Sequence, residues 1–206
     1  VVDTDVKNRL RSGALKRRLG TLSKGTVILK IRDPDITTTG CVNLAPERAR
    51  YKAGDINLVA ERGREAPFFN CKSLLRVYLK GCTKLTSVGT AAFLNCSSLT
   101  SVVLPDSLTQ LGDDVFDGCT SLTSVVLPDS LTHMGMGAFS KCSSLTSVVF
   151  PGSLTELGDT AFARCSSLTS VVFPNSLTVL GDAAFGLCTS LTSVVLPDSA
   201  ELGNGV

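Results

Sequence analysis

The residues that could carry chemistry in this chain are few, and most of them recur at a fixed interval. The single histidine, His133, occupies a slot that holds Gln110, Glu156 and Val179 in the neighbouring intervals. A slot that accepts such different side chains is typical of a surface position. We therefore interpret His133 as an incidental surface residue, and we expect neither a catalytic residue set nor a cofactor.

Five of the eight cysteines share one position of the interval: Cys96, Cys119, Cys142, Cys165 and Cys188. If the intervals stack as parallel strands do, equivalent residues lie about 5 Å apart, which is compatible with a disulfide. A column of identical positions is explained more simply by buried thiols that pack as small apolar groups. Disulfides and a metal remain the alternatives, although no pair has the C-x-x-C spacing of a zinc site. This pattern neither requires nor excludes an oxidising compartment.

Three aspartates, Asp113, Asp159 and Asp182, share another position and could form a column of carboxylates. A calcium site is one interpretation, but Met136 interrupts the column and the dense acidic spacing of calcium loops is missing. We expect instead that each aspartate caps one short helical turn, which holds Phe116 and Cys119 in the first complete unit. No metal site is predicted.

These residues are positioned by a 23-residue repeat, in which the phenylalanines mark the period: Phe93, Phe116, Phe139, Phe162 and Phe185. A period of this length is typical of a solenoid. One set per repeat is predicted to face inward: Leu99, Val102, Leu104, Leu108, Leu111, Phe116 and Cys119. Burying one large apolar side chain contributes about 1.5–3 kcal/mol, whereas ordering each residue costs about 1–2 kcal/mol. A single repeat is therefore not stable alone, and several stacked repeats are.

The repeat pattern C-S-S-L-T-S-V-V-L-P-D-S-L-T-x-L-G-D-x-x-F resembles the BspA-like leucine-rich repeat over about residues 68–206. The resemblance implies a right-handed leucine-rich-repeat solenoid with a parallel β-sheet on the concave side and turns and short helical segments on the convex side. It also implies a role in adhesion or protein–protein interaction, mostly in secreted or surface proteins of microbes.

The charge divides the chain into two parts. Residues 1–66 hold 14 Lys plus Arg against 8 Asp plus Glu, and residues 67–206 hold 6 against 10. We predict a basic N-terminal arm and cap over 1–66 and a solenoid of about five to six repeats over 67–206. Within the first part, residues 6–19 permit an amphipathic helix, and Thr26–Ile31 and Ile56–Ala60 are candidate strands. The cationic residues of the arm are Lys7, Arg9, Arg11, Lys16, Arg17, Arg18 and Lys24.

A basic arm could bind nucleic acid, acidic lipid or an acidic protein surface. No aromatic side chains are interleaved for base stacking, and Asp3 and Asp5 dilute the charge. We therefore interpret the arm as a solvated helix or flexible segment, and we do not expect nucleic acid or an anionic membrane as the partner.

The predicted protein-binding face is the outward side of the long strands. Its residues are Arg76, Tyr78, Ser101, Val103, Ser124, Val126, Ser147, Val149, Ser170 and Val172. An exposed apolar stripe often marks a contact site. A tuned binding face normally varies between repeats, however, and this one is nearly uniform.

We predict a non-enzymatic protein-interaction or adhesion module whose partner is another protein. The alternative is an accessory subunit of a larger assembly, held by the basic arm and by contact at the C-terminal open end, since no polar capping unit follows Leu196. The start at Val1 indicates a processed product or part of a longer chain. We favour a secreted or cell-surface location, with an organelle complex, after removal of a targeting segment, as the alternative.

Overall fold

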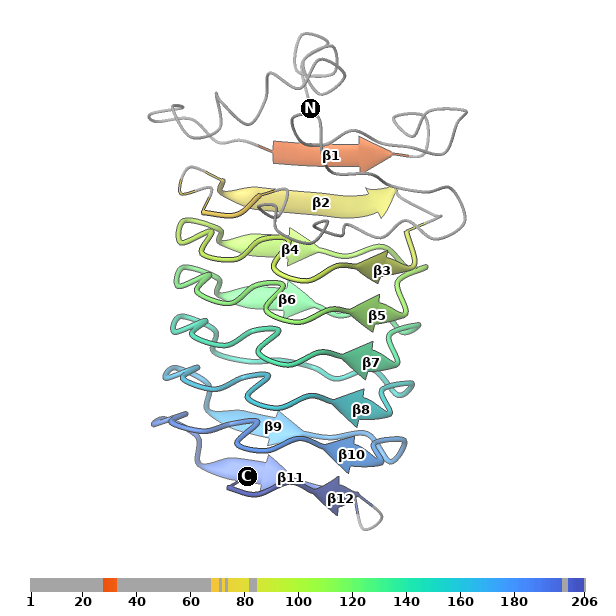
Figure 1. The fold of residues 1–206 in the computed structure, drawn as a ribbon, viewed down its shortest axis with the longest axis vertical. Helices are drawn as coiled ribbons and strands as arrows, with labels where there is room; N and C mark the ends of the chain where they lie inside the picture. Colours follow the sequence, from red (N-terminus) through yellow and green to blue (C-terminus); the bar gives the residue numbers. More distant parts are fainter. Residues whose placement is uncertain are drawn as a thin grey trace, which may run out of the picture.

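The chain winds into a stack of parallel turns, each lying beside the one before it (Figure 1). The structure, a computed structural model, describes residues 28–32, 68–70, 72, 74–81, 85–197 and 200–205. Most repeats in this part contribute one three-residue strand and one two-residue strand, and every strand pairs in parallel with its equivalent in a neighbouring repeat. The fold is the parallel-strand solenoid that the period predicts.

The longer strands form one column, which we call the Ser-Val-Val ladder. Its members are β1 (Ile28–Arg32), β2 (Arg76–Gly81), β4 (Ser101–Val103), β6 (Ser124–Val126), β9 (Ser170–Val172) and β11 (Ser193–Val195). The first four form one sheet, and β9 and β11 form another. A strand was predicted at Thr26–Ile31, and the structure confirms it as β1, which pairs with β2 and so extends the ladder beyond the repeats.

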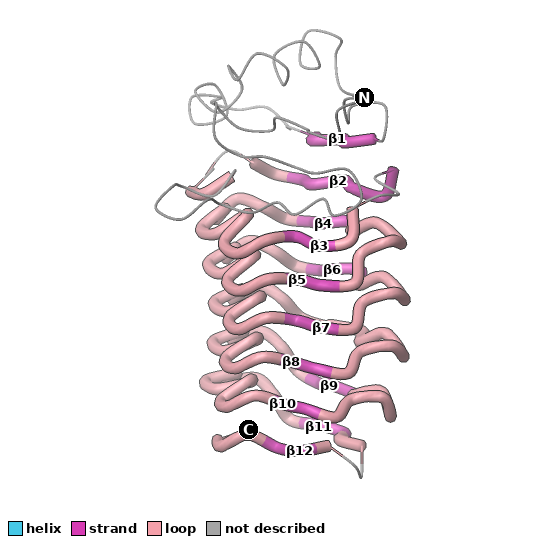
Figure 2. Tube along the Cα trace, turned by 45° about the vertical axis from the view of Figure 1, so that its right-hand side comes forward, coloured by secondary structure: helices cyan, strands magenta, loops and turns pink. Residues whose placement is uncertain are grey.

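The shorter strands form a second column, the short-strand ladder. Its members are β3 (Ser87–Val88), β5 (Gln110–Leu111), β7 (His133–Met134), β8 (Glu156–Leu157), β10 (Val179–Leu180) and β12 (Glu201–Leu202). These strands make one continuous six-stranded parallel sheet. Figure 2 shows the two ladders as separate columns joined by bends.

The Ser-Val-Val ladder is interrupted at residues 147–149, which are not in a strand although their sequence matches β6 and β9. Beside the interruption, Thr169 N lies 3.4 Å from Thr146 O, whereas the equivalent distance from Thr192 N to Thr169 O is 2.9 Å. Phe150 follows this segment where earlier repeats have leucine, and its ring packs edge-on against Phe162 at 5.6 Å. The larger side chain does not by itself explain the interruption, because Phe173 follows β9 with a similar edge contact to Phe185 and β9 is a regular strand.

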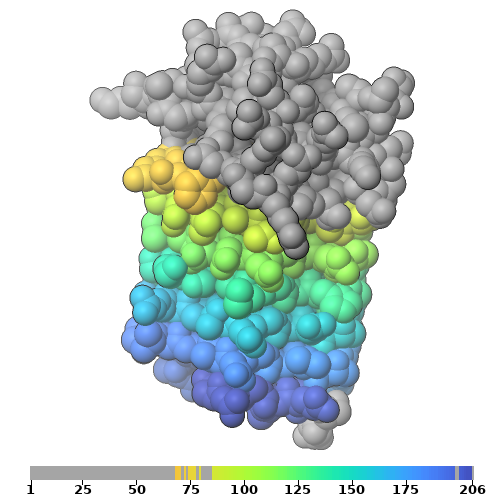
Figure 3. Space-filling model, viewed as in Figure 1, coloured from red at the N-terminus to blue at the C-terminus, as the bar shows by residue number. Residues whose placement is uncertain are grey.

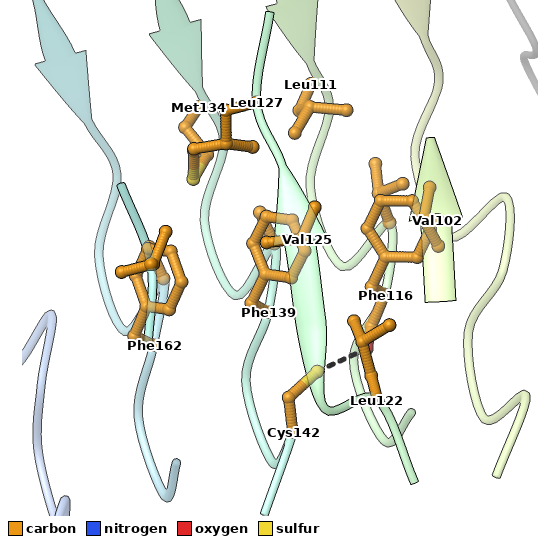
Figure 4. Packing of buried hydrophobic residues seen from close by; sticks show 14 of the residues in the cluster. Val102, Leu111, Phe116, Leu122, Val125, Leu127, Met134, Phe139, Cys142 and Phe162 are labelled. Carbon is orange, nitrogen blue, oxygen red and sulfur yellow. Dashed lines mark hydrogen bonds between the residues drawn. The ribbon is translucent and has the colours of Figure 1, made fainter. Parts of the chain in front are cut away.

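The interior contains the residues that the period predicts. All seven members of the inward set, from Leu99 to Cys119, are at most 3% exposed. The phenylalanines form a stack in which Phe116, Phe139 and Phe162 have centroids 5.1 and 5.2 Å apart (Figure 4). Stacked rings in a closely packed core contribute more than their buried area alone.

The predicted helical turn around Phe116 is wrong, because the structure has hydrogen-bonded turns and no helix in the described repeats. Asp114 and Gly118 have φ of 53° and 73°, which are left-handed values that an α-helix cannot contain. The amides of Asp114, Phe116 and Gly118 donate to Met136 O, Ala138 O and Ser140 O of the next repeat at 2.8–2.9 Å. The backbone amides here thus form hydrogen bonds to the next turn of the solenoid, which we call a rung, instead of bonds along a helix.

The aspartates consequently do not cap helices, which corrects the sequence prediction. Asp113 Oδ1 accepts a hydrogen bond from Met136 N at 2.9 Å, and Asp159 Oδ1 accepts one from Asp182 N at 2.8 Å. Asp182 Oδ1 accepts from Asn204 N at 2.6 Å. Each carboxylate therefore satisfies an amide of the following rung.

The predictions for the basic arm, the amphipathic helix over 6–19 and the strand Ile56–Ala60 lie outside the described residues. The division of the chain at residues 66 and 67 stays a prediction. Within the described part, no helix is long and apolar enough to cross a membrane.

Candidate binding surfaces

The Ser-Val-Val ladder presents the predicted protein-binding residues outward. In β6 and β9 the middle valine is buried and the residues on both sides face solvent, because side chains alternate along a strand. The outer valines are largely exposed, at 67% for Val126, 80% for Val149 and 62% for Val172. The result is an apolar stripe flanked by serine hydroxyls.

This face carries no charged side chain at its outward strand positions from β4 to β11. Threonines along its edge are held in place, since Thr100 Oγ1 donates to Leu75 O at 2.9 Å and Thr192 Oγ1 donates to Thr169 O at 3.1 Å. Fixed hydroxyls and valines of nearly uniform type give a preorganised, neutral surface.

The first rung differs from the others, as the sequence indicates. Arg76 is exposed in β2 and lies in register with Ser101, while Tyr78 lies in register with Val103. The Tyr78 side chain falls outside the described residues. Ser101 and Val103 are half-buried, so the exposed stripe becomes prominent from β6 onward.

The short-strand ladder carries a second surface, which the sequence prediction missed. Ser87, Gln110, His133 and Glu156 are in direct register along β3, β5, β7 and β8. A groove of about 390 Å³ runs beside them. We call it the polar groove, and its lining residues are Ser87, Val88, Gly89, Thr90, Gln110, Leu111, Gly112, Asp113, His133, Met134, Gly135 and Glu156.

A sequence signal for this surface was available. The outward positions of the long strands are nearly uniform, whereas the first position of the short strand changes from Ser to Gln, His and Glu. Positions of the turn, such as Gly118, Lys141 and Arg164, vary as well, so variation alone does not single out the short strand. Only the stacked structure shows that the varied residues share one groove. Figure 3 shows the stacked rungs as one continuous surface on the side that carries this ladder.

His133 takes part in two contacts in the groove. Its Nδ1 lies 2.7 Å from Thr132 Oγ1, and its Nε2 lies 3.6 Å from Glu156 Oε2. The Thr132 hydroxyl already donates to Thr109 O, so Nδ1–H donates to Thr132 Oγ1. Nε2 faces the Glu156 carboxylate, and this exposed contact is an ion pair only when the ring is protonated.

The five predicted ladder cysteines are free thiols, and the first four are buried. Each Sγ donates to a phenylalanine carbonyl of the preceding rung, for example Cys142 Sγ to Phe116 O at 3.3 Å (Figure 4). Burial raises the pKa of the Cys119 thiol to about 12. The pKa of Cys142 is likewise raised by burial. A raised pKa makes Cys119 and Cys142 poor nucleophiles, so these two thiols act as structural donors. Cys188 differs, because it is half-buried and its pKa is lowered by a hydrogen bond with Cys165.

The acidic residues of the turn do not form a metal centre. In the part of the chain that the structure describes, no group of three His, Cys, Asp or Glu residues could hold a metal ion. Asp117 is nearly buried, and its Oδ2 pairs with Lys141 Nζ at 3.0 Å, while its Oδ1 has no hydrogen-bond partner. Burial, followed by the charges of Asp117 and Asp113, raises the pKa of Asp114.

Apolar side chains are exposed near the C-terminal end of the described residues, including Leu187 in the turn after β10, at 66%, and Leu202 in β12, at 55%. Contact of a partner with this end stays a prediction, as does any contact made by the basic arm.

The fold and its two outward ladders define a repeat protein of the leucine-rich-repeat solenoid class. A family model described as BspA type leucine rich repeat region matches six copies over residues 86–205. The chain belongs to this family, whose members are generally not enzymes. The search of curated proteins finds no match.

Solved bacterial structures share the fold. A leucine-rich repeat protein of T. pallidum has a TM-score of 0.69 at 30% identity, covering 86% of this chain and 73% of that one. A leucine-rich cell surface protein from Faecalibacterium prausnitzii has a TM-score of 0.53 at 37% identity, over 57% of this chain and 32% of that one. A Bacteroides ovatus leucine-rich repeat protein has a TM-score of 0.55 at 26% identity, over 86% and 48%. The chain thus spans less than half of the latter two proteins.

Proposed function

We propose that this chain is a non-enzymatic protein-interaction module that holds a partner protein against its Ser-Val-Val ladder. The observation that carries the proposal is the stripe of exposed valines, of which Val149 is the most exposed, at 80%. Covering apolar surface contributes about 25 cal/mol per Å². Water-exposed valines aligned over several rungs are therefore a ready source of binding energy.

The neutrality of this face favours a protein over a polyanion. Nucleic acid and anionic membranes bind mainly through clustered lysine and arginine, and the outward strand positions from β4 to β11 have none. Serine and threonine hydroxyls beside the valines can pair with backbone or side-chain groups of a partner. The cores of protein interfaces are apolar and poor in charged residues, and their rims are polar.

The proposal includes a location at the cell surface or outside the cell. It is supported by the Faecalibacterium prausnitzii structure, which is described as a cell surface protein. Adhesion to another cell or to a matrix is one form that such an interaction could take.

The test is site-specific photocrosslinking in the source cells. A photoreactive amino acid at position 149 should give a crosslinked protein partner, and the same group at Asn175, exposed in a turn, should not. Val126→Glu, placed elsewhere on the stripe, should abolish the crosslink, because it buries an unpaired charge in the interface. Equal crosslinking from both positions, or a crosslink that survives Val126→Glu, would contradict the proposal.

A further inference from the structure

The polar groove combines three features that are independent of the Ser-Val-Val ladder. It is hollowed, it is lined by polar side chains, and it gathers outward residues that change from one rung to the next. Identical rungs present identical contacts, whereas a row of Ser87, Gln110, His133 and Glu156 distinguishes one rung from the next. Specific recognition requires such differences.

The groove is lined by the polar side chains of Gln110, His133 and Glu156 and by Thr90 and Asp113. Glycine at position 112 lets two rungs approach closely beside the groove, because a Cβ there would come within 2.9 Å of Thr90 N in the preceding rung.

The hydrogen-bonding groups suit a ligand that both donates and accepts at short intervals. Gln110 offers an amide, Thr90 offers a hydroxyl, and Glu156, whose Oε2 lies 3.6 Å from His133 Nε2, offers a carboxylate. The two oxygens of a carboxylate can accept hydrogen bonds from the adjacent hydroxyl groups of a sugar ring. Amide, carboxylate and hydroxyl groups together pair with a polyhydroxylated ligand without requiring it to be charged.

The spacing of the rungs distinguishes a sugar chain from an extended peptide. Successive rungs are 5.0–5.2 Å apart, as the stacked rings from Phe68 to Phe162 show. Like-facing side chains of an extended peptide recur about every 6.6 Å. A peptide that ran along the groove would therefore lose register with the rungs within a few repeats. One pyranose ring of an extended, β-linked chain advances by a distance close to one rung.

From these observations we propose that the polar groove binds an extended oligosaccharide, with about one sugar ring per rung along β3, β5, β7 and β8. The site lies on a different ladder from the proposed protein contact. A negative result for one proposal therefore does not contradict the other.

The test is calorimetric titration of the full chain with cellohexaose and with chitohexaose, followed by shorter members of each series. At least one series should bind, and affinity should rise with length up to four rings, one for each groove rung, and then level off. Gln110→Ala and Glu156→Ala should each lower the affinity about five- to tenfold, the factor that loss of one hydrogen bond typically produces.

A matched control variant is Ser124→Ala, which removes an exposed hydroxyl from the Ser-Val-Val ladder and should leave sugar binding unchanged. All variants should unfold at the same denaturant concentration as the parent chain, because the altered residues are exposed. The proposal is overturned if neither sugar series binds, or if both groove variants keep the parent affinity. Binding of a lysine-containing extended peptide in place of sugars would assign the groove to a basic protein segment and would also overturn it.

Discussion

Asp114, in the turn, combines a left-handed backbone conformation with a partly buried carboxylate. Its φ of 53° is left-handed, a conformation that asparagine and glycine adopt more readily than most residues. Its carboxylate is partly buried near Asp113 and Asp117, and these surroundings raise its pKa. A raised pKa means that the folded state binds the proton more tightly than the unfolded state. Stability therefore falls as the pH rises through the interval from 3.8 to the folded-state pKa.

Asp114→Asn should therefore increase the free energy of unfolding at neutral pH, because it keeps the side-chain shape and removes a poorly solvated charge. The gain should shrink below pH 3.8, where Asp114 itself is largely protonated in both states. Urea unfolding at the two pH values measures the effect. Asp106→Asn, at an exposed turn, is the control and should change stability little. A gain that is the same at both pH values would contradict the electrostatic explanation.

At the scale of one element, the aspartate column stabilises the bend by satisfying amides of the following rung. The column is interrupted at Met136, which is 49% exposed and stands where the other rungs have Asp113, Asp159 and Asp182. The sequence already showed this interruption. Its consequence is visible only in the structure, because no side-chain acceptor at position 136 faces the amide of Asp159.

Met136→Asn should supply that acceptor and raise the unfolding free energy by about 0.5–2 kcal/mol, the range for side-chain oxygens that satisfy an orphan amide. Asparagine is preferred over aspartate because it adds no negative charge between Asp113 and Asp159. Thermal or chemical denaturation measures the change. Met136→Ala serves as the control, since it removes the methionine without adding an acceptor, and an equal gain from both variants would refute the interpretation.

At the scale of the whole molecule, stability comes from contacts between neighbouring rungs, as in other solenoids. Phe139 is fully buried and stacks between Phe116 and Phe162. Phe185 has one stacked neighbour, Phe162, at 5.5 Å, and an edge contact with Phe173. The centre of the stack should therefore be more sensitive to loss of a ring than its end.

Phe139→Ala should lower the unfolding free energy by about 3–5 kcal/mol through the cavity that it leaves. Phe185→Ala should cost less, and Val126→Ala, on the exposed stripe, should stay within about 0.5 kcal/mol. Denaturant titration of the three variants compares them directly. If Val126→Ala were as damaging as Phe139→Ala, the assignment of inward and outward positions would be incorrect.

The sequence by itself determined the period, the buried columns and the uniform valine stripe, because a repeat that buries its apolar side chains on its neighbours must repeat those side chains. Leu99, Phe116 and Cys119 were placed inside on that ground, and the structure confirms it.

The partners of the turn residues were not determined in this way. The left-handed residues at Asp114 and Gly118 direct amides and aspartates toward the next rung, where the pattern predicted a helix. The grouping of Gln110, His133 and Glu156 in one groove was also decided by the tertiary structure. Periodicity identifies which residues are equivalent, whereas the path of the coil decides which outward columns adjoin a hollow.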